Sequence, residues 1–496
     1  MIDNNIKHKA ASGVLWTTLQ QFCLLAIQFG ISIYIARILG PKDYGLVGMV
    51  IIFIAISEVF IQSGLMSALV QKKDADSLDY SSVFFFNLLT AFLLYGIIYL
   101  SAPFIADFYS APLLTVILHV LALKLIIGSF SQVQRIILFK NLQFKKLAVI
   151  NVGGALVSSV VGLSMALSGF GVWSLVWQQI AVEATCLLMC WFKASWYPHF
   201  RFSYSRIMYL LSFGSKILMA EVIDAVFKNI YSVVIGKCYN PVNLGYYLRA
   251  NSLCVIFQNS CSKPLVQTSI PVFSKLQDNN SDMQKSLLKY TKYLLFILLP
   301  IMLGMFLVSH SLVEVLLTAK WLPAVDYIKI LCIVSIIAPL SSLFVGILKA
   351  KRRGGLFLGI ELTRKILLVI IVSATFRYGV LMMIYGLVVQ SLIAYLLCCY
   401  CVKGLIGLKL KSFHVSLLPY LANALIMFTV LYILKDFLDS NLMQLLLLPV
   451  FGGVIYAIGA WVLRLDVLKD IYAYSLNIPL INKYTRKFGK RFEWLT

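Results

Sequence analysis

Fourteen long apolar stretches run through this sequence and restrict how the chain can fold. Each holds about 20 residues, the length at which an α-helix crosses the hydrocarbon core of a bilayer. The stretches cover residues 13–36, 44–71, 82–102, 113–134, 147–168, 171–192, 207–236, 246–272, 290–309, 323–348, 355–376, 379–402, 414–434 and 442–463. The chain is 60% hydrophobic and 13% charged, which excludes a soluble enzyme and a disordered protein. We therefore expect an all-α polytopic membrane protein with about 14 transmembrane helices.

The distribution of basic residues tests this helix count, because correctly placed helices sort Lys and Arg to the cytoplasmic side. With the N-terminus inside, 29 of the 43 Lys and Arg residues fall on the inner side, seven in outer loops and seven within helices. A missed helix would scramble this asymmetry, so we expect both termini in the cytoplasm. Most of the net charge of +23 then faces anionic headgroups, which makes membrane lipids, not nucleic acid, the expected partner.

One turn pattern occurs twice, at residues 37–45 and 237–245, with an offset of 200 residues and no gap. Each copy has a basic residue, Gly or Asn, Pro, Asp or Asn, and Gly, a composition that ends one helix and begins the next. Six expected helices separate the copies, so the two halves run parallel about an axis along the membrane normal. We expect an N-terminal lobe at residues 1–203, a C-terminal lobe at 204–411, and two extra helices with a basic tail at 412–496.

Several ionisable residues lie inside the expected helices. Such a residue costs about 2.5–3.5 kcal/mol on insertion scales, so it faces a cavity or a partner. Helix 207–236 carries a stripe of acids and bases, and helix 246–272 is rich in Ser, Asn and Gln with Pro264 and Pro271, as expected of a bent helix along a wet path. The cations on these two helices are Lys216, Lys228, Arg249 and Lys263, against the acids Glu221 and Asp224. This surplus of positive charge predicts an anionic substrate.

Other charges within the expected helices are fewer. Glu58 occupies the repeat-related place in the first half, and Lys124 and Glu183 add one charge each. Three neighbours on helix 355–376 are Glu361, Arg364 and Lys365. The sequence leaves open whether these three form structural ion pairs or line a cavity.

The sequence contains no H-E-x-x-H, G-x-S-x-G or Walker A motif, and its outer loops are short. An enzyme that polymerises glycans at the outer face would need a large outer loop with catalytic carboxylates. We therefore expect no enzymatic activity and no cofactor. Transport would draw on a gradient of H⁺ or Na⁺, or on consumption of the product.

Four segments resemble the Wzx-type oligosaccharide flippases, especially the WzxC-like polysaccharide transporters of the MOP superfamily. They are Ala36-Arg-Ile-Leu-Gly-Pro-Lys-Asp-Tyr-Gly45, Gly245-Tyr-Tyr-Leu-Arg-Ala250, Ile270-Pro-Val-Phe-Ser-Lys-Leu-Gln-Asp278 and Thr318-Ala-Lys-Trp321. The resemblance implies two six-helix lobes in a V around a cationic cavity that alternates between the faces of the bacterial inner membrane. The implied function is to flip an undecaprenyl-diphosphate-linked oligosaccharide repeat unit into the periplasm for O-antigen, capsule or exopolysaccharide assembly.

The resemblance also implies roles for the charged residues. The substrate-binding cations would be Lys216, Lys228, Arg249 and Lys263, with Lys124 as a further candidate, and the ion-coupling candidates are Glu58, Glu221, Asp224 and Glu183. The implied partners are the lipid-linked oligosaccharide and the polysaccharide polymerase and chain-length machinery. Two alternatives stay open: a MATE-like ion-coupled exporter of small molecules, which predicts an acid-rich cavity, and a membrane glycosyltransferase or polymerase, which predicts carboxylates on outer loops.

Overall fold

A computed structural model describes residues 4–72, 74–193 and 196–470, and every regular element within these ranges is a helix. The expectation of an all-α protein is therefore confirmed. Packing divides the chain into two compact units, Met1–Leu248 and Arg249–Thr496. This division falls within α9 (Pro241–Lys275), whose first turns belong to the first unit and whose remainder belongs to the second. The division expected from the sequence repeat, into lobes at 1–203 and 204–411 with extra helices at 412–496, stays a prediction.

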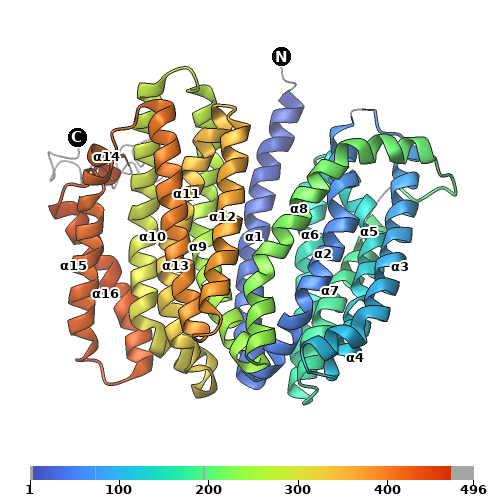
Figure 1. Cartoon of the computed structure of the whole chain (residues 1–496), viewed down its shortest axis with the longest axis horizontal. Coiled ribbons are helices and arrows are strands. Elements are labelled where there is room, and N and C mark those ends of the chain that lie inside the picture. Colours follow the sequence, from blue (N-terminus) through green and yellow to red (C-terminus); the bar gives the residue numbers. More distant parts are fainter. Residues whose placement is uncertain (1–3, 73, 194–195, 471–496) are drawn as a thin grey trace. The chain divides into compact units, whose positions relative to one another are not determined.

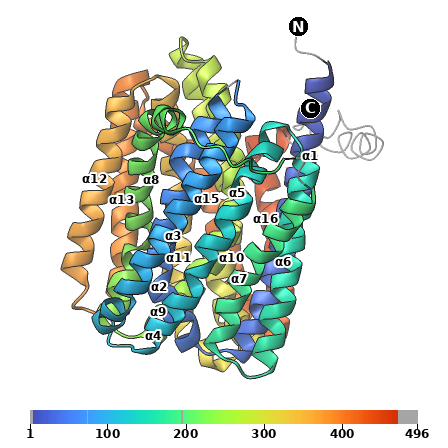
Figure 2. The same ribbon diagram turned by 90° about the vertical axis from the view of Figure 1, so that its right-hand side faces the viewer.

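The first unit is a bundle of helices, most of them long enough to cross a membrane (Figures 1 and 2). Its helices are α1 (Asn4–Ile38), α2 (Pro41–Gln71), α3 (Ser77–Phe108), α4 (Leu113–Leu121), α5 (Leu123–Lys140), α6 (Phe144–Leu167), α7 (Val172–Lys193) and α8 (Tyr204–Cys238). Within it α6 packs against α1 and α7, α5 packs against α3 and α7, and α2 packs extensively against α8. The bundle thus joins helices that are far apart in the sequence.

The second unit is built around α10, at the centre of its contacts. It contains α10 (Asn280–Leu317), the short 3₁₀ helix η1 (Ala319–Trp321), α11 (Ala324–Ala350), α12 (Gly354–Thr375), α13 (Val380–Ile406), α14 (Leu410–Val415), α15 (Leu418–Lys435) and α16 (Asn441–Val462). On one side α10 contacts α11, which packs against α13, and on the other it contacts the α15–α16 hairpin. The two extra helices therefore attach to the unit through α10 (Figure 1).

All fourteen expected spans coincide with helices, two of them as broken helices. The span at 113–134 is α4 followed by α5, and the one at 414–434 begins in α14 and continues as α15, which has Pro419 in its first turn. Among the described residues, eleven spans are long and apolar enough to cross a membrane. The three remaining long helices are α8, α9 and α12, which carry the charged stripes noted in the sequence. The count of fourteen thus stays a prediction.

The two copies of the repeated turn have matching helix ends and are closed by different capping hydrogen bonds. The helix before each turn ends at Ile38 or Cys238, and the next helix begins at Pro41 or Pro241. In the first turn the Gly40 N–H donates to Asp43 Oδ2 at 3.0 Å, and in the second the Asn243 N–H donates to Asn240 Oδ1 at 2.8 Å. Proline suits the first helical position because its missing N–H would have had no intrahelical partner there.

Candidate functional site

The α8 stripe, defined here as Glu221, Asp224 and Lys228, lies on an exposed face halfway along α8. Glu221 is exposed, and Lys228 Nζ pairs with Asp224 Oδ2 at 2.7 Å one turn away. The Lys228 and Asp224 side chains are 74% and 47% exposed, so the pair is open to its surroundings. The same helix packs extensively against α2. Lys216 lies in the same helix, but its side chain is outside the described residues.

The α9 stripe is a run of exposed polar residues at helical spacing along α9. Its members are Ser252, Asn259, Ser260, Lys263, Gln267, Thr268 and Ser274. At about 100° per residue, Ser252, Asn259, Lys263, Gln267 and Ser274 share one face of the helix, Ser260 lies at the edge of that face, and Thr268 lies away from it. Lys263 is exposed near its middle and forms no ion pair among the described residues. Hydroxyls and amides beside an ammonium group can hydrogen-bond a sugar and hold an anionic group.

Arg249 differs from the other cations expected at the site. Only 5% of its surface is exposed, at the start of the second unit. A buried guanidinium is costly without partners, and Arg249 takes part in at least one hydrogen-bonding, ionic or ring interaction. Its position in α9 places it three residues before the exposed track begins at Ser252.

Two of the other expected residues, Glu58 and Lys124, meet inside the first unit. Lys124 Nζ of α5 lies 2.8 Å from Glu58 Oε1 of α2 and donates to Gln179 Oε1 of α7 at 3.2 Å. The Lys124 side chain is 14% exposed. This interhelical pair offsets the cost of placing both charges at membrane depth.

Glu183 of α7 also has a cationic partner, Arg135 of α5, which the sequence analysis did not pair with it. Arg135 Nη2 of α5 lies 3.3 Å from Glu183 Oε2, and both side chains are about three-quarters buried. Gly128 of α5 borders the Glu183 carboxylate, and a Cβ built there would lie at an ordinary 3.5 Å from Glu183 Oε2. Counting charges by side of the membrane put Arg135 just beyond the span at 113–134, in an inner segment, and the structure shows that α5 continues to Lys140. The helical spacing between Arg135 and Gly128, about two turns, would have placed both on one face.

On α12 the ambiguous triplet contains an ion pair within the helix. Arg364 Nη1 donates to Glu361 Oε1 at 3.1 Å, three residues away, and both side chains are about one-third exposed. Lys365 also has a polar interaction. The geometry favours the structural interpretation for this group.

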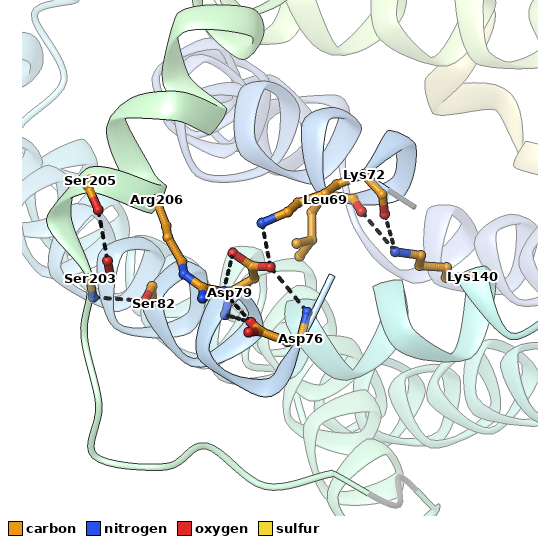
Figure 3. Close-up of polar contacts among 9 residues, drawn as sticks. All are labelled: Leu69, Lys72, Asp76, Asp79, Ser82, Lys140, Ser203, Ser205 and Arg206. Carbon is orange, nitrogen blue, oxygen red and sulfur yellow. Dashed lines mark hydrogen bonds and ion pairs between the residues drawn. The ribbon is translucent and has the colours of Figure 1, made fainter. Parts of the chain in front are cut away.

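A charged cluster lies where α2, α3, α5 and α8 end or begin, at the predicted inner face (Figure 3). Asp79 is completely buried and pairs with Lys72 Nζ at 2.6 Å and with Arg206 Nη1 at 3.1 Å. Arg206 also binds Asp76, the N-cap residue of α3. The hydrogen bond from Arg206 lowers the pKa of Asp76 to about 2. Lys140 donates to the Lys72 carbonyl oxygen, which links α5 to the cluster.

Metal ligands do not gather anywhere in the part of the chain that the structure describes: no group of three or more His, Cys, Asp or Glu side chains could hold a metal ion there. The expectation that the protein uses no cofactor stays a prediction. So do the individual roles assigned to the charged residues.

Comparisons with known sequences place these features in a family. A model of the polysaccharide biosynthesis protein family matches residues 34–326, more than half of the chain. The chain is 25% identical over 437 residues to the teichuronic acid biosynthesis protein TuaB of Bacillus subtilis, covering 85% of this chain and 88% of TuaB. It is 24% identical over 458 residues to the succinoglycan biosynthesis transport protein ExoT of Rhizobium meliloti, covering 89% and 91%. The lipopolysaccharide biosynthesis protein WzxC of Escherichia coli is 20% identical over 355 residues, covering 70% and 71%.

Solved structures show the same fold. The lipid II flippase MurJ in an inward closed conformation matches with a TM-score of 0.76 at 16% identity, covering 92% of this chain and 100% of MurJ. An inward-facing MATE family transporter of the MOP superfamily matches with a TM-score of 0.61 at 14% identity, covering 80% and 99%. The resemblance drawn from the sequence motifs is thereby confirmed. The chain is a multi-pass membrane protein with the MurJ and MATE fold, and it belongs to the polysaccharide biosynthesis protein family.

Proposed function

We propose that this protein is a flippase that moves an undecaprenyl-diphosphate-linked oligosaccharide repeat unit across the bacterial inner membrane by alternating access. The flipped unit would supply assembly of a surface polysaccharide, together with a polymerase and chain-length machinery. Membership of the family and relatives named for teichuronic acid, succinoglycan and lipopolysaccharide biosynthesis support a lipid-linked glycan as the cargo. Both termini would lie in the cytoplasm.

The observation that carries this proposal is the α9 stripe. Exposed polar groups along a helix of membrane length are costly unless they meet water or a polar substrate. A chain of hydroxyls and amides suits sugar hydroxyls, and Lys263 supplies a positive charge for a diphosphate through charge-assisted hydrogen bonds. The polyprenyl tail needs no polar contact and would stay in the lipid.

The coupling ion would act at Glu221. The other two glutamates proposed for this role each hold a cation, Glu58 through Lys124 and Glu183 through Arg135. Glu221 is exposed, and among the side chains that the structure describes no cation pairs with it. An exposed carboxylate without a fixed countercharge can take up a proton or Na⁺, whereas a carboxylate beside a Lys or Arg must first lose that partner.

The cargo assignment is tested with purified protein in vesicles that contain a lipid-linked oligosaccharide, scored by glycan that reaches the opposite leaflet. We expect Lys263→Ala to reduce transport on the order of tenfold to a hundredfold, because a hydrogen bond to a charged group contributes about 1.5–3 kcal/mol. Lys275→Ala is the matched control, since Lys275 is an exposed Lys at the end of the same helix. Equal transport by the two variants would reject the role of Lys263.

The same vesicles separate the alternative functions. A small-molecule exporter would move a cationic dye and leave the glycan in its original leaflet. A glycosyltransferase or polymerase would lengthen the glycan without translocating it. Transport of an unmodified lipid-linked glycan without dye export is the result that the proposal requires.

A further inference from the structure

The two repeated turns contact each other, and each half of the contact mirrors the other. A Cβ atom built on Gly45 would lie 1.7 Å from the Pro241 carbonyl oxygen, and one built on Gly245 would lie 1.9 Å from the Pro41 carbonyl oxygen. Real Cβ atoms do not come closer than about 3 Å to such atoms. Only glycine therefore fits at either position.

This reciprocity has the geometry of a two-fold axis. In a self-complementary contact, residue i of one copy meets residue j of the other and j meets i, as Gly45 with Pro241 and Gly245 with Pro41 do here. The two pairs are related by the same 200-residue offset as the sequence repeat. The symmetry of this contact is thus local to the first turns of α2 and α9.

The contact is formed by backbone against backbone. Each glycine turns its α-hydrogen toward a carbonyl oxygen, an arrangement of individually weak Cα–H···O contacts. Small residues allow two helix backbones to approach in this way within a membrane. Gly48 continues the approach, because a Cβ there would lie 2.1 Å from Leu248 Cδ1. Gly45 and Gly245 are both buried.

We propose that this Gly45–Gly245 contact is the outer closure of the transport path, which separates when cargo leaves on the outer side. The inference rests on the proposed function and on the predicted orientation, in which both turns lie at the outer face. The contacts that the two glycines make with the prolines are individually weak. Two backbones in direct contact leave no space for a glycan to pass until they separate.

Distance measurements test whether the glycines hold the turns together. Spin labels are attached at the repeat-equivalent positions in Lys42→Cys/Val242→Cys protein, with the exposed Cys238 replaced by Ser. Adding Gly45→Ala or Gly245→Ala should shift the main distance between the labels to longer values. Gly40→Ala is the control, because a Cβ there would meet only Asp43 Oδ2, at an ordinary 3.8 Å. A folded Gly45→Ala protein with an unchanged distance would overturn the proposal.

Cross-linking tests whether the turns must separate, and it needs no glycine substitution. A short bismaleimide that joins the two introduced cysteines of the Lys42→Cys/Val242→Cys protein, again with Cys238→Ser, should abolish glycan transport in vesicles. Each protein with only one of the two introduced cysteines should transport normally after the same treatment. Full transport by the cross-linked protein would show that the two turns stay together during transport, and it would reject the proposal that they separate.

The two experiments separate the closure from the function on which it rests. The distance measurement requires no cargo, so it reports on the turns even in a protein that moves no glycan. A shifted distance in a protein that moves no glycan in any form would therefore reject the proposed function and leave the glycine contact standing as a closure of some other path.

Discussion

Charged residues at membrane depth have different partners in the interior of the first unit and on the exposed faces of α8 and α9. In the interior, Glu58 pairs with Lys124 and Glu183 with Arg135, each pair joining two helices. On α8 the pair Asp224–Lys228 lies within one helix and is largely exposed, and on α9 Lys263 has no ionic partner among the described residues. An interhelical pair fixes how helices pack, whereas an exposed charge is available to a substrate or an ion.

This difference divides the nine residues expected at the site into two groups. Glu58, Lys124 and Glu183 have the geometry of packing residues. Glu221, Asp224, Lys228 and Lys263 have that of residues that contact something outside the protein. Arg249 is buried, and the side chain of Lys216 is outside the described residues. The predictions below test the division through stability and transport.

The largest effect on stability is expected from Arg135→Ala. The substitution leaves the Glu183 carboxylate without its cation inside the bundle, and removing one partner of a buried pair costs about 3 kcal/mol or more. Thermal unfolding in detergent micelles should show a clearly lowered transition. The double variant Arg135→Met/Glu183→Met, which leaves no lone charge, should recover most of the loss. An Arg135→Ala protein as stable as the wild type would show that this pair does not stabilise the packing of the bundle.

A smaller effect is expected from exchanging the charges of the Glu58–Lys124 pair. Either single reversal puts two like charges within about 3 Å and should lower both yield and thermal stability. The double reversal Glu58→Lys/Lys124→Glu restores an ion pair and should restore stability and transport together. Restored stability without transport would assign one of the two residues to ion coupling, against the packing role.

How far the sequence predicts these two regions follows from which residues each depends on. Hydropathy suffices for the helices, because the requirement for about 20 apolar residues is local. The repeated turn is also local, and Pro41 and Pro241 mark helix starts that the structure reproduces. The polar face of α9 follows from the spacing of its own residues, so its exposure could be expected in advance.

Interhelical pairs could not be derived in this way. Glu58 lies on α2 and Lys124 on α5, with α3 and α4 between them along the chain, and the pairing depends on which faces of α2 and α5 meet. Charge counting could not reveal the Arg135–Glu183 pair either, because it assigns a cation to a side of the membrane and not to a partner. The contact of Gly45 with Pro241 was hidden for the same reason: the sequence shows two similar turns, not their proximity.

The charged cluster at the predicted inner face combines both kinds of charge, because Asp79 is buried like the interior pairs and Asp76 is half-exposed like the charges on α8. Because Arg206 lowers the pKa of Asp76 from 3.8 to about 2, this pairing contributes stability above about pH 4 and loses it as the pH falls toward 2. Asp76→Asn keeps an N-cap side chain for α3, so it should cost only about 0.5 kcal/mol at pH 7. Unfolding curves of the two proteins should converge near pH 2. If the difference in stability between the two proteins stays constant down to pH 2, the charge of Asp76 is not the cause of that difference.

The smallest effect on stability, and the sharpest test of the division, comes from Lys228→Ala. Its pair with Asp224 is 74% and 47% exposed, nearly the same as the 76% and 47% of the Lys285–Asp282 pair on α10. Exposed pairs within a helix contribute about 0.3–0.5 kcal/mol, so Lys228→Ala and Lys285→Ala should unfold almost together. Transport should separate them, because only Lys228 lies well inside a membrane-length helix, whereas Lys285 lies near the start of one. If Lys228→Ala moves lipid-linked glycan as fast as Lys285→Ala, then exposure at membrane depth does not mark a residue of the transport path. The assignment of the exposed charges to substrate contact would then be wrong.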